Sequence, residues 1–293
     1  MLPWVITVIM MYLAAVGVLY VAQDKLLFPR TLTHRGHLPL PSGSERVELV
    51  SSEGHRLVGY ALRRPQAKDI VLLFTGNAWN AEDCFIYSAE RFRGAHLMAF
   101  HYRGYTPSEG TPSEAALLED AVAQRDLARR LFNHPAEQGR IYAVGYSIGT
   151  GVAARLAGDG AVDGAVLVTP FDSVEAVAKS RYFFAPVSVL LKNKFRSDRA
   201  LSGKDVPVAV IMAALDRVIP KARSDALVAQ LGRPVLVETV QGAGHVSLYD
   251  LPLFDELLAV ALVKVMESRP PGVPRHVPGR AGMLLEEGVA GSG

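Results

Sequence analysis

The sequence predicts an α/β fold in which a mostly parallel sheet carries helices on both faces. Apolar segments of strand length begin near residues 70, 97, 141, 165, 208 and 235, and helical patterns at 81–93, 114–132, 150–157, 221–231 and 251–266 alternate with them. Strands and helices that alternate in this way form parallel βαβ units. A chain of 293 residues with 49% hydrophobic and 20% charged residues can bury the core of one such domain, which we place at residues 45–266.

The amino-terminal residues 1–23 contain no charged side chain and are rich in Val, Ile, Leu and Met. A helix rises about 1.5 Å per residue, so some 20 residues span a hydrocarbon core of roughly 30 Å. We therefore expect a single-pass membrane anchor at 1–23, followed by a linker at 24–44. A cleaved signal peptide is the alternative, but the usual positive n-region is missing, and cleavage at Ala15-Val16-Gly17 would leave an apolar stub.

The side of the membrane on which the domain lies stays open. Lys25, Arg30 and Arg35 follow the span and only the terminal amine precedes it, which favours a cytoplasmic domain by the positive-inside rule. After the linker, residues 46–50 and 56–62 alternate around Glu53-Gly54-His55, a pattern that predicts an antiparallel hairpin at the start of the sheet.

Residues 145–149 have the pattern G-x-S-x-G, with Ser147 at its centre. The pattern directly follows the apolar run 141–144 and precedes the small-residue helical run 150–157, so it joins a strand to a helix through a sharp turn. In this context it is typical of the nucleophile elbow of α/β-hydrolases, which lifts the serine oxygen above the sheet. A serine in an ordinary β-turn is the alternative, and the presence of suitable partners argues against it.

A serine nucleophile needs a histidine to take its proton and a carboxylate to orient that histidine. Asp216 follows the strand at 207–212, and His245 lies in the glycine-rich loop after the strand at 234–240. Both positions are at the carboxyl ends of strands, where sites form in open parallel sheets, and the order Ser, Asp, His is that of α/β-hydrolases. We predict the triad Ser147, Asp216 and His245, with Asp172, after the preceding strand, as the competing acid.

Two backbone N–H groups usually stabilise the oxyanion of an acyl-transfer intermediate, one from the residue after the nucleophile and one from the loop after the third strand. Ile148 is expected to supply the first. Asn77, in the segment 75–78 after the apolar strand at 70–74, is expected to supply the second. The same segment is also typical of a turn with Asn80 as the N-cap of a helix that begins near Ala81, and both interpretations can hold together.

Between residues 171 and 203 the alternation of strands and helices lapses. Tyr182, Phe183 and Phe184, followed by the apolar run 187–191, predict a small cap after the sixth strand, with the three aromatic side chains over the substrate. An extended crossover helix with a long loop is the alternative. Beyond residue 266 a series of Pro and Gly residues predicts a disordered tail at 267–293.

With these pieces placed, residues 1–266 resemble the membrane-anchored α/β-hydrolase-domain family of serine hydrolases, often called Bem46-like. The segments that carry the resemblance are an amino-terminal anchor leading into QDKLLFP (23–29), FTGNA (74–78), HYRGYTPSEG (101–110), GYSIG (145–149), TPFDS (169–173) and KNKF (192–195), together with Asp216 and His245. The resemblance implies an α/β-hydrolase fold, serine hydrolase activity, and a catalytic domain on the side of the membrane opposite to the one that the positive-inside rule favours.

Two positions depart from the family pattern. The family has histidine where this chain has Thr75, and aspartate where it has His101. In the family that histidine braces the oxyanion loop, so the resemblance implies an intact triad with a differently held loop. A hydrogen bond from the Thr75 hydroxyl is the expected replacement.

The sequence therefore predicts a membrane-anchored serine hydrolase that cleaves an ester or thioester of a lipid or other acyl substrate through an acyl-enzyme. An acyltransferase on the same site and a catalytically inactive α/β-hydrolase used as a binding module remain open. No metal-binding or dinucleotide motif is visible, so no cofactor is expected. The net charge of +2 and the absence of a basic stretch give no nucleic-acid surface, and the single cysteine, Cys84, is expected to pack in a helix.

Overall fold

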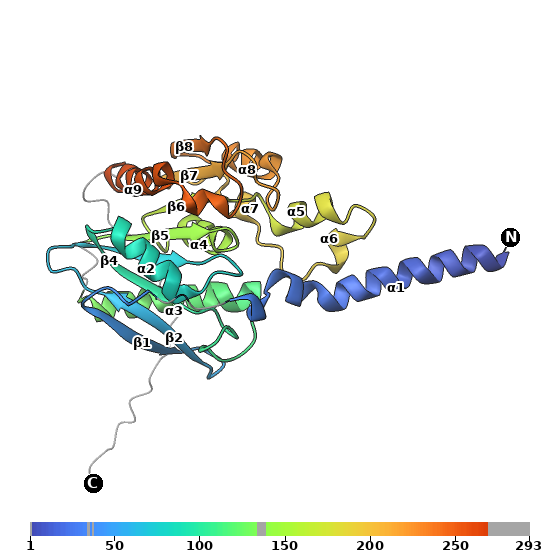
Figure 1. Ribbon diagram of the computed structural model, residues 1–293, viewed down its shortest axis with the longest axis horizontal. Coiled ribbons are helices and arrows are strands. Elements are labelled where there is room, and N and C mark those ends of the chain that lie inside the picture. The colour runs from blue at the N-terminus through green and yellow to red at the C-terminus, as the bar shows by residue number, and fades with distance from the viewer. Residues whose placement is uncertain (1, 34–35, 37, 134–138, 269–293) are drawn as a thin grey trace, which may run out of the picture.

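The computed structural model describes residues 2–33, 36, 38–133 and 139–268, and this part of the chain contains one eight-stranded sheet (Figure 1). The strand order is β1-β2-β4-β3-β5-β6-β7-β8. β2 runs antiparallel to its neighbours β1 and β4, and the remaining neighbours pair in parallel. The strands are β1 (Ser44–Val50), β2 (Arg56–Leu62), β3 (Asp69–Phe74), β4 (Ala95–Phe100), β5 (Ile141–Tyr146), β6 (Gly164–Val168), β7 (Val208–Ala213) and β8 (Pro234–Val240).

Helices cover both faces of this sheet, which confirms the predicted fold class. One face carries α2 (Ala81–Arg91) and α9 (Pro252–Glu267), and the other carries α3 (Glu114–Leu131), α4 (Gly149–Gly158) and α8 (Lys221–Val228). A separate hydrophobic core lies on each face. Because central parallel strands are buried on both faces, they appear in the sequence as continuous apolar runs.

Side chains at the predicted helix starts make the expected caps. Asn80 accepts a hydrogen bond from the backbone N–H of Glu82 at the start of α2, and Ser113 accepts one from Ala116 at the start of α3. Such caps each stabilise a helix by about 1 kcal/mol. Asn80 therefore stabilises the first turn of α2, which begins a few residues after Asn77 in the chain.

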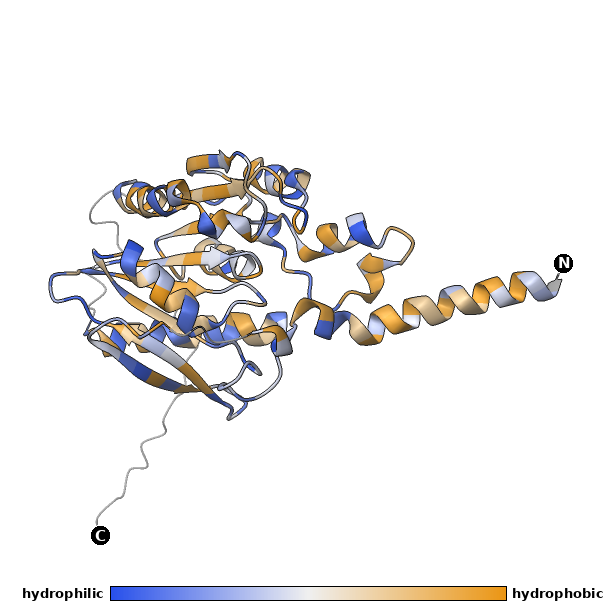
Figure 2. Cartoon of the chain, viewed as in Figure 1, coloured by the Kyte–Doolittle hydropathy of each residue, from blue (hydrophilic) through white to orange (hydrophobic). Residues whose placement is uncertain are grey.

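An apolar helix, α1 (Leu2–Leu27), precedes the domain and extends away from it (Figure 1). Hydrophobic residues lie along its whole length (Figure 2). Among the described residues, Pro3–Leu32 is the one stretch long and apolar enough to cross a membrane, on length and composition alone, and a signal sequence passes the same test. The helix thus continues beyond residue 23, where we expected the anchor to end.

The predicted linker at 24–44 is not a free tether. Residues 24–27 are helical, the short helix η1 (Arg30–Leu32) follows, and Phe28 is buried with its ring centroid 6.5 Å from that of Phe195. Burial of the large apolar side chain of Phe28 favours docking over a flexible connection. The predicted tail at 267–293 lies outside the described residues from 269 onward, and Glu267 is still helical.

The segment after β6 contains three short helices, α5 (Val174–Arg181), α6 (Val187–Leu190) and α7 (Ser197–Leu201). α5 and α6 project from the sheet on the same side as α1, beside its carboxyl-terminal part (Figure 1). The last short helix, η2 (Ser247–Asp250), lies between β8 and α9. We call residues 171–203 the cap, as predicted from the sequence.

Candidate active site

Ser147 stands at a sharp turn between β5 and α4, with a backbone φ of 50°. A positive φ is strained for a residue other than glycine, and it is the conformation of a nucleophile elbow. Gly145 and Gly149 are needed for close approach, not for unusual φ angles. A Cβ atom on Gly149 would lie 2.2 Å from the carbonyl oxygen of Phe74, and one on Gly145 would lie 2.5 Å from that of Gly149.

The structure brings the three predicted triad residues together. Nε2 of His245 lies 3.0 Å from Oγ of Ser147, and Nδ1 of His245 lies 2.7 Å from Oδ2 of Asp216. The other carboxylate oxygen of Asp216 accepts hydrogen bonds of 2.8 Å from the backbone N–H groups of Val218 and Ile219. Asp216 is thus fixed on both oxygens, and an imidazole with its proton on Nδ1 presents a basic Nε2 to the serine.

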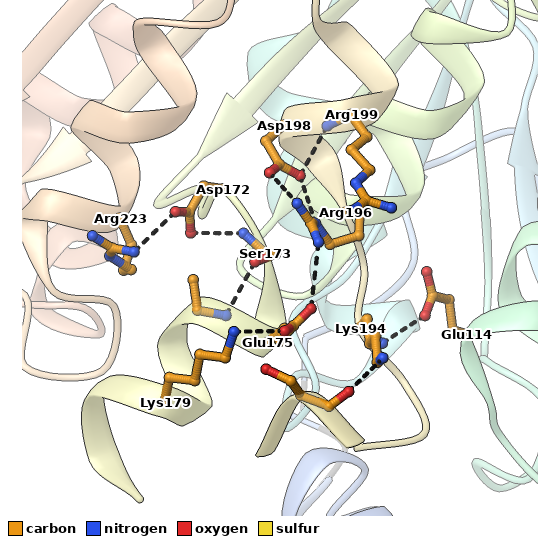
Figure 3. Close-up of polar contacts among 12 residues, drawn as sticks. Glu114, Asp172, Ser173, Glu175, Lys179, Lys194, Arg196, Asp198, Arg199 and Arg223 are labelled. Carbon is orange, nitrogen blue, oxygen red and sulfur yellow. Dashed lines mark hydrogen bonds and ion pairs between the residues drawn. The ribbon is translucent and has the colours of Figure 1, made fainter. Parts of the chain in front are cut away.

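The competing acid, Asp172, lies in a different network at the base of the cap (Figure 3). Its carboxylate accepts hydrogen bonds from the backbone of Ser173 at 2.7 Å and from Arg223 at 3.1 Å. Burial raises the pKa of Asp172, while Ser173 and Arg223 act in the opposite direction. Since these partners occupy both carboxylate oxygens, we assign Asp172 to cap attachment.

Among the described residues, three hydrogen bonds that involve a side chain hold the predicted oxyanion loop, residues 75–78. The Tyr102 hydroxyl donates to the carbonyl of Thr75 at 2.8 Å, and the Tyr105 hydroxyl donates to the carbonyl of Asn77 at 2.9 Å. The Asn77 side chain donates to the carbonyl of Leu27, the last residue of α1, at 2.9 Å. Within the described residues the carbonyl of Thr75, not its hydroxyl, makes the bracing contact, so our expectation for that hydroxyl is not met.

Thr75 and His101, the two departures from the family pattern, line the same small pocket behind the oxyanion loop. Both side chains are buried. Burial, with a smaller contribution from Arg46, lowers the pKa of His101 to about 4, so this imidazole is neutral at pH 7. His101 therefore adds no charge near the loop.

An apolar cavity of about 240 Å³ opens at Ser147 and is also lined by Asn77 and Ile148. Ile148 is the N-cap residue of α4, where backbone N–H groups are free of helical partners. The cavity thus brings together the nucleophile and both predicted sources of oxyanion N–H groups. Such a cavity, mostly apolar with a few polar groups in its lining, is typical of a small-molecule site.

The cap forms much of this cavity, but not through all three predicted aromatic residues. Tyr182 lines it. Phe183 and Phe184 do not; they are 86% and 45% exposed at the tip of the cap, where the backbone turn between α5 and α6 directs them outward. The substrate-lining role that we expected for these two residues is therefore not supported by the geometry.

One wall of the cavity was not anticipated from the sequence. It comes from α1, which contributes Val16, Leu19, Tyr20, Gln23, Leu26 and Leu27. A helix that is apolar on every side carries no periodic signal that distinguishes a cavity-facing stripe from a lipid-facing one. The polar side chain of Gln23, where the apolar run ends, was the available hint.

The single cysteine lies outside the site. Cys84 is buried in α2, and burial raises the pKa of its thiol. Within the described ranges no cluster of three or more His, Cys, Asp or Glu side chains could hold a metal ion. The hydrogen-bonded chain from Asp216 through His245 to Ser147 supports covalent acyl chemistry on Ser147.

Comparison with known proteins places this site in a family. No family model matches the chain. The chain is 32% identical over 210 residues to an uncharacterized protein of Mycobacterium tuberculosis. This alignment covers 70% of this chain and 73% of the mycobacterial protein. It is 30% identical over 154 residues to the lysophosphatidylserine lipase ABHD12 of Danio rerio, covering 46% of this chain and 39% of that protein.

Among solved structures, an esterase from Pyrococcus furiosus superposes with a TM-score of 0.63 at 16% identity and covers 80% of this chain and 96% of its own. At this identity the similarity concerns the fold. The solved structure thus shows the α/β-hydrolase fold, and the similarity to the mycobacterial protein and to ABHD12 shows that the chain belongs to the α/β-hydrolase-domain (Bem46-like) family of serine hydrolases.

Proposed function

We propose that this protein is a membrane-anchored serine hydrolase that cleaves the ester or thioester of an acyl lipid through an acyl-enzyme on Ser147, His245 and Asp216. The observation that carries the proposal is the hydrogen-bonded chain of 2.7 Å and 3.0 Å from Asp216 through His245 to Ser147, at the end of an apolar cavity.

In the first half-reaction, Oγ of Ser147 attacks the carbonyl carbon of the substrate, and its proton passes to Nε2 of His245. Asp216 stabilises the imidazolium that forms, and the backbone N–H groups of Asn77 and Ile148 stabilise the oxyanion. The intermediate collapses when the bond to the leaving oxygen or sulfur breaks. The proton on His245 passes to that atom, and the acyl group stays on Ser147.

In the second half-reaction, water replaces the leaving group. His245 takes a proton from water, the oxygen of water bonds to the acyl carbon, and the bond to Ser147 breaks as Oγ recovers the proton. An acceptor alcohol in place of water would give acyl transfer. The two outcomes are distinguished by product analysis with a competing alcohol.

Contacts between α1 and the cap support a retained anchor over a cleaved signal peptide. The hydroxyl of Tyr12 donates to the carbonyl of Phe184 at 3.0 Å. The backbone N–H of Lys192 donates to Gln23 at 2.9 Å, and the side chain of Asn193 donates to Asp24 at 2.9 Å. Removal of α1 would break these bonds and open one side of the cavity.

The tip of the cap supports access of substrate from the membrane. Tyr12 contacts the backbone of Phe184, whose ring centroid lies 5.9 Å from that of Phe183, whereas the ammonium of Lys192 lies 4.9 Å from the ring of Tyr20. Eight helical residues rise about 12 Å, which is the axial distance between these two levels of α1. In a bilayer spanned by α1, the aromatic tip would lie in the hydrocarbon and the lysine nearer the headgroups.

The substrate class that fits this arrangement is a lipid with a single acyl chain for the cavity and a headgroup that remains at the interface. The name of the relative ABHD12, a lysophosphatidylserine lipase, agrees with this class. An apolar cavity discriminates chain lengths by about 1 to 3 kcal/mol per methylene, so we expect a preference and not strict specificity.

Covalent labelling tests the catalytic proposal. A fluorophosphonate probe should label the wild-type protein and not Ser147→Ala, and a panel of esters and thioesters of graded chain length should be cleaved by the wild type alone. Absence of labelling in a folded wild-type protein would favour the inactive binding module.

Access from the membrane is tested separately in liposomes with full-length protein. Phe183→Ser/Phe184→Ser should lower kcat/KM for a bilayer-resident ester several-fold more than for a soluble ester of the same acyl group. Leu253→Ser, at a similarly exposed apolar position on α9, is the matched control. Equal losses on both esters would contradict entry from the membrane.

A further inference from the structure

We infer that α1 is a wall of the acyl-binding site and that one face of this helix sets acyl chain length. The inference rests on the proposed function in one respect, since it takes an acyl chain as the occupant of the cavity. It goes beyond anchoring, because it makes the amino-terminal helix a specificity-determining part of the active site.

The first observation is the spacing of the lining residues. Val16, Leu19, Tyr20 and Gln23 follow the spacing i, i+3, i+4 and i+7, so they lie on one face of α1, and all four line the cavity that opens at Ser147. On the other side of the same turns, Val18 and Val21 are 66% and 76% exposed. The helix therefore has a cavity face and an outer face, although both are apolar.

The second observation is a set of polar contacts that fixes the rotation of α1 about its axis. Gln23 accepts from the backbone N–H of Lys192 at 2.9 Å and donates to the carbonyl of Leu190 at 3.3 Å. Asp24 accepts from Asn193 at 2.9 Å and pairs with the ammonium of Lys192 at 3.2 Å. Helices that only tether a domain need no such contacts, and here they point the same face of α1 into the cavity.

These contacts explain why two segments of the sequence carried the family resemblance together. QDKLLFP (23–29) supplies Gln23, Asp24 and Phe28, and KNKF (192–195) supplies Lys192, Asn193 and Phe195. The two segments meet through the hydrogen bonds above and through the rings of Phe28 and Phe195. They dock the end of α1 on the cap.

The third observation links α1 to the catalytic machinery. The carbonyl of Leu27 accepts the hydrogen bond from the side chain of Asn77, whose backbone belongs to the oxyanion loop. The helix is therefore positioned relative to Ser147 at its carboxyl end. Val16 lies about 16 Å farther along the axis, so the cavity face extends away from the nucleophile in the direction an acyl chain would take.

Matched substitutions on the two faces test the inference in full-length protein in detergent micelles, with soluble butyrate and dodecanoate esters of one leaving group. Leu19→Trp fills the cavity and should lower kcat/KM for the dodecanoate at least about ten-fold more than for the butyrate. Leu19→Ala enlarges it and should shift the preference toward longer chains. Val18→Trp, one residue away on the outer face, should leave the ratio of the two esters unchanged within about two-fold.

The inference is overturned if Leu19→Trp and Leu19→Ala leave the dodecanoate-to-butyrate ratio at the wild-type value, or if Val18→Trp moves it as much as Leu19→Trp does. A binding measurement separates this result from a failure of the proposed function. Displacement of a dansyl-labelled undecanoic acid by fatty acids of graded length needs no turnover. If wild-type protein cleaves no ester but Leu19→Trp still weakens binding of the longer acids selectively, the catalytic proposal fails and the role of α1 stands; if binding is also unchanged, both fail.

Discussion

The catalytic edge of the sheet and the wall of the cavity are built in different ways. Ser147, Asp216 and His245 each follow a strand, and the local backbone determines where each side chain points. The wall combines α1 with the cap, segments more than a hundred residues apart in the sequence that meet through bonds such as the one from Lys192 to Gln23. The positions of the triad side chains therefore follow from local structure, whereas the wall of the cavity depends on tertiary contacts.

This difference assigns chemistry and selectivity to separate parts of the molecule. The edge supplies the groups that act on the reacting atoms. The wall supplies apolar contacts that add binding free energy with chain length. Substitutions at the edge should therefore change the rate for every substrate, whereas substitutions in the wall should change the ranking of substrates.

The largest effect is expected at the edge. Ser147→Ala and His245→Ala should each lower kcat by about 10⁵- to 10⁶-fold, and the double variant should lose little more, because the triad residues act as one unit. Burst and steady-state kinetics on a soluble ester measure the losses. Additive losses, with the double variant far below either single one, would show that the two residues act independently.

A second test at the edge compares the two acids. Asp216→Asn should lower kcat by about 10⁴-fold, because an amide favours the wrong tautomer of His245. Asp172→Asn removes an ion pair with Arg223 that is partly exposed on the arginine side and should cost about 1 kcal/mol of stability or less, with little change in kcat. The reverse order of the two kcat values would show that Asp172 is the acid.

The contrast between local and tertiary structure also explains which features of the molecule could be predicted from the sequence. The strands, the cap at Asn80 and the turn at Ser147 depend on neighbouring residues, so periodicity and short motifs were sufficient. Residues 24–29 were predicted as linker, although α1 continues to Leu27, because nothing local indicates that Phe28 is buried by Phe195. Phe183 and Phe184 were assigned to the cavity because aromatic residues usually favour burial, yet the short turn after α5 exposes them.

The oxyanion loop lies where the catalytic edge meets the wall, and substitutions behind it should have effects of intermediate size. Thr75→His alone places a second ring beside buried His101, and overpacking of this kind costs about 1 to 3 kcal/mol. Thr75→His/His101→Asp restores both family residues, and we expect it to recover the lost stability. Activity should survive in both variants, because Tyr102 and Tyr105 still hold the loop.

Thermal unfolding and ester hydrolysis of the two variants measure these effects. Thr75→Ser is the matched control, since it keeps a small hydroxyl side chain in the same pocket. A severe loss of kcat in folded Thr75→His would indicate that Thr75 itself takes part in oxyanion stabilisation. A double variant less stable than Thr75→His would show that the two positions are not coupled.

The last test concerns the pH dependence of stability behind the loop, where no change in catalytic rate is involved. Burial lowers the pKa of His101 to about 4 in the folded protein, below the value of about 6.5 in an unfolded chain. Above pH 6.5 the imidazole is neutral in both states, and the stability is fully present. As the pH falls toward 4 the unfolded chain binds a proton that the folded protein does not, so stability is lost, by on the order of 2 kcal/mol at pH 5.

Urea unfolding in detergent at pH 7 and pH 5 should therefore show a smaller pH-dependent loss for His101→Leu than for wild type. His55→Leu removes a histidine that is partly exposed in the turn between β1 and β2 and serves as the control. If His101→Leu retains the full wild-type dependence, the proton that destabilises the protein binds elsewhere, and the pocket behind the oxyanion loop is open enough to solvate a charged imidazole.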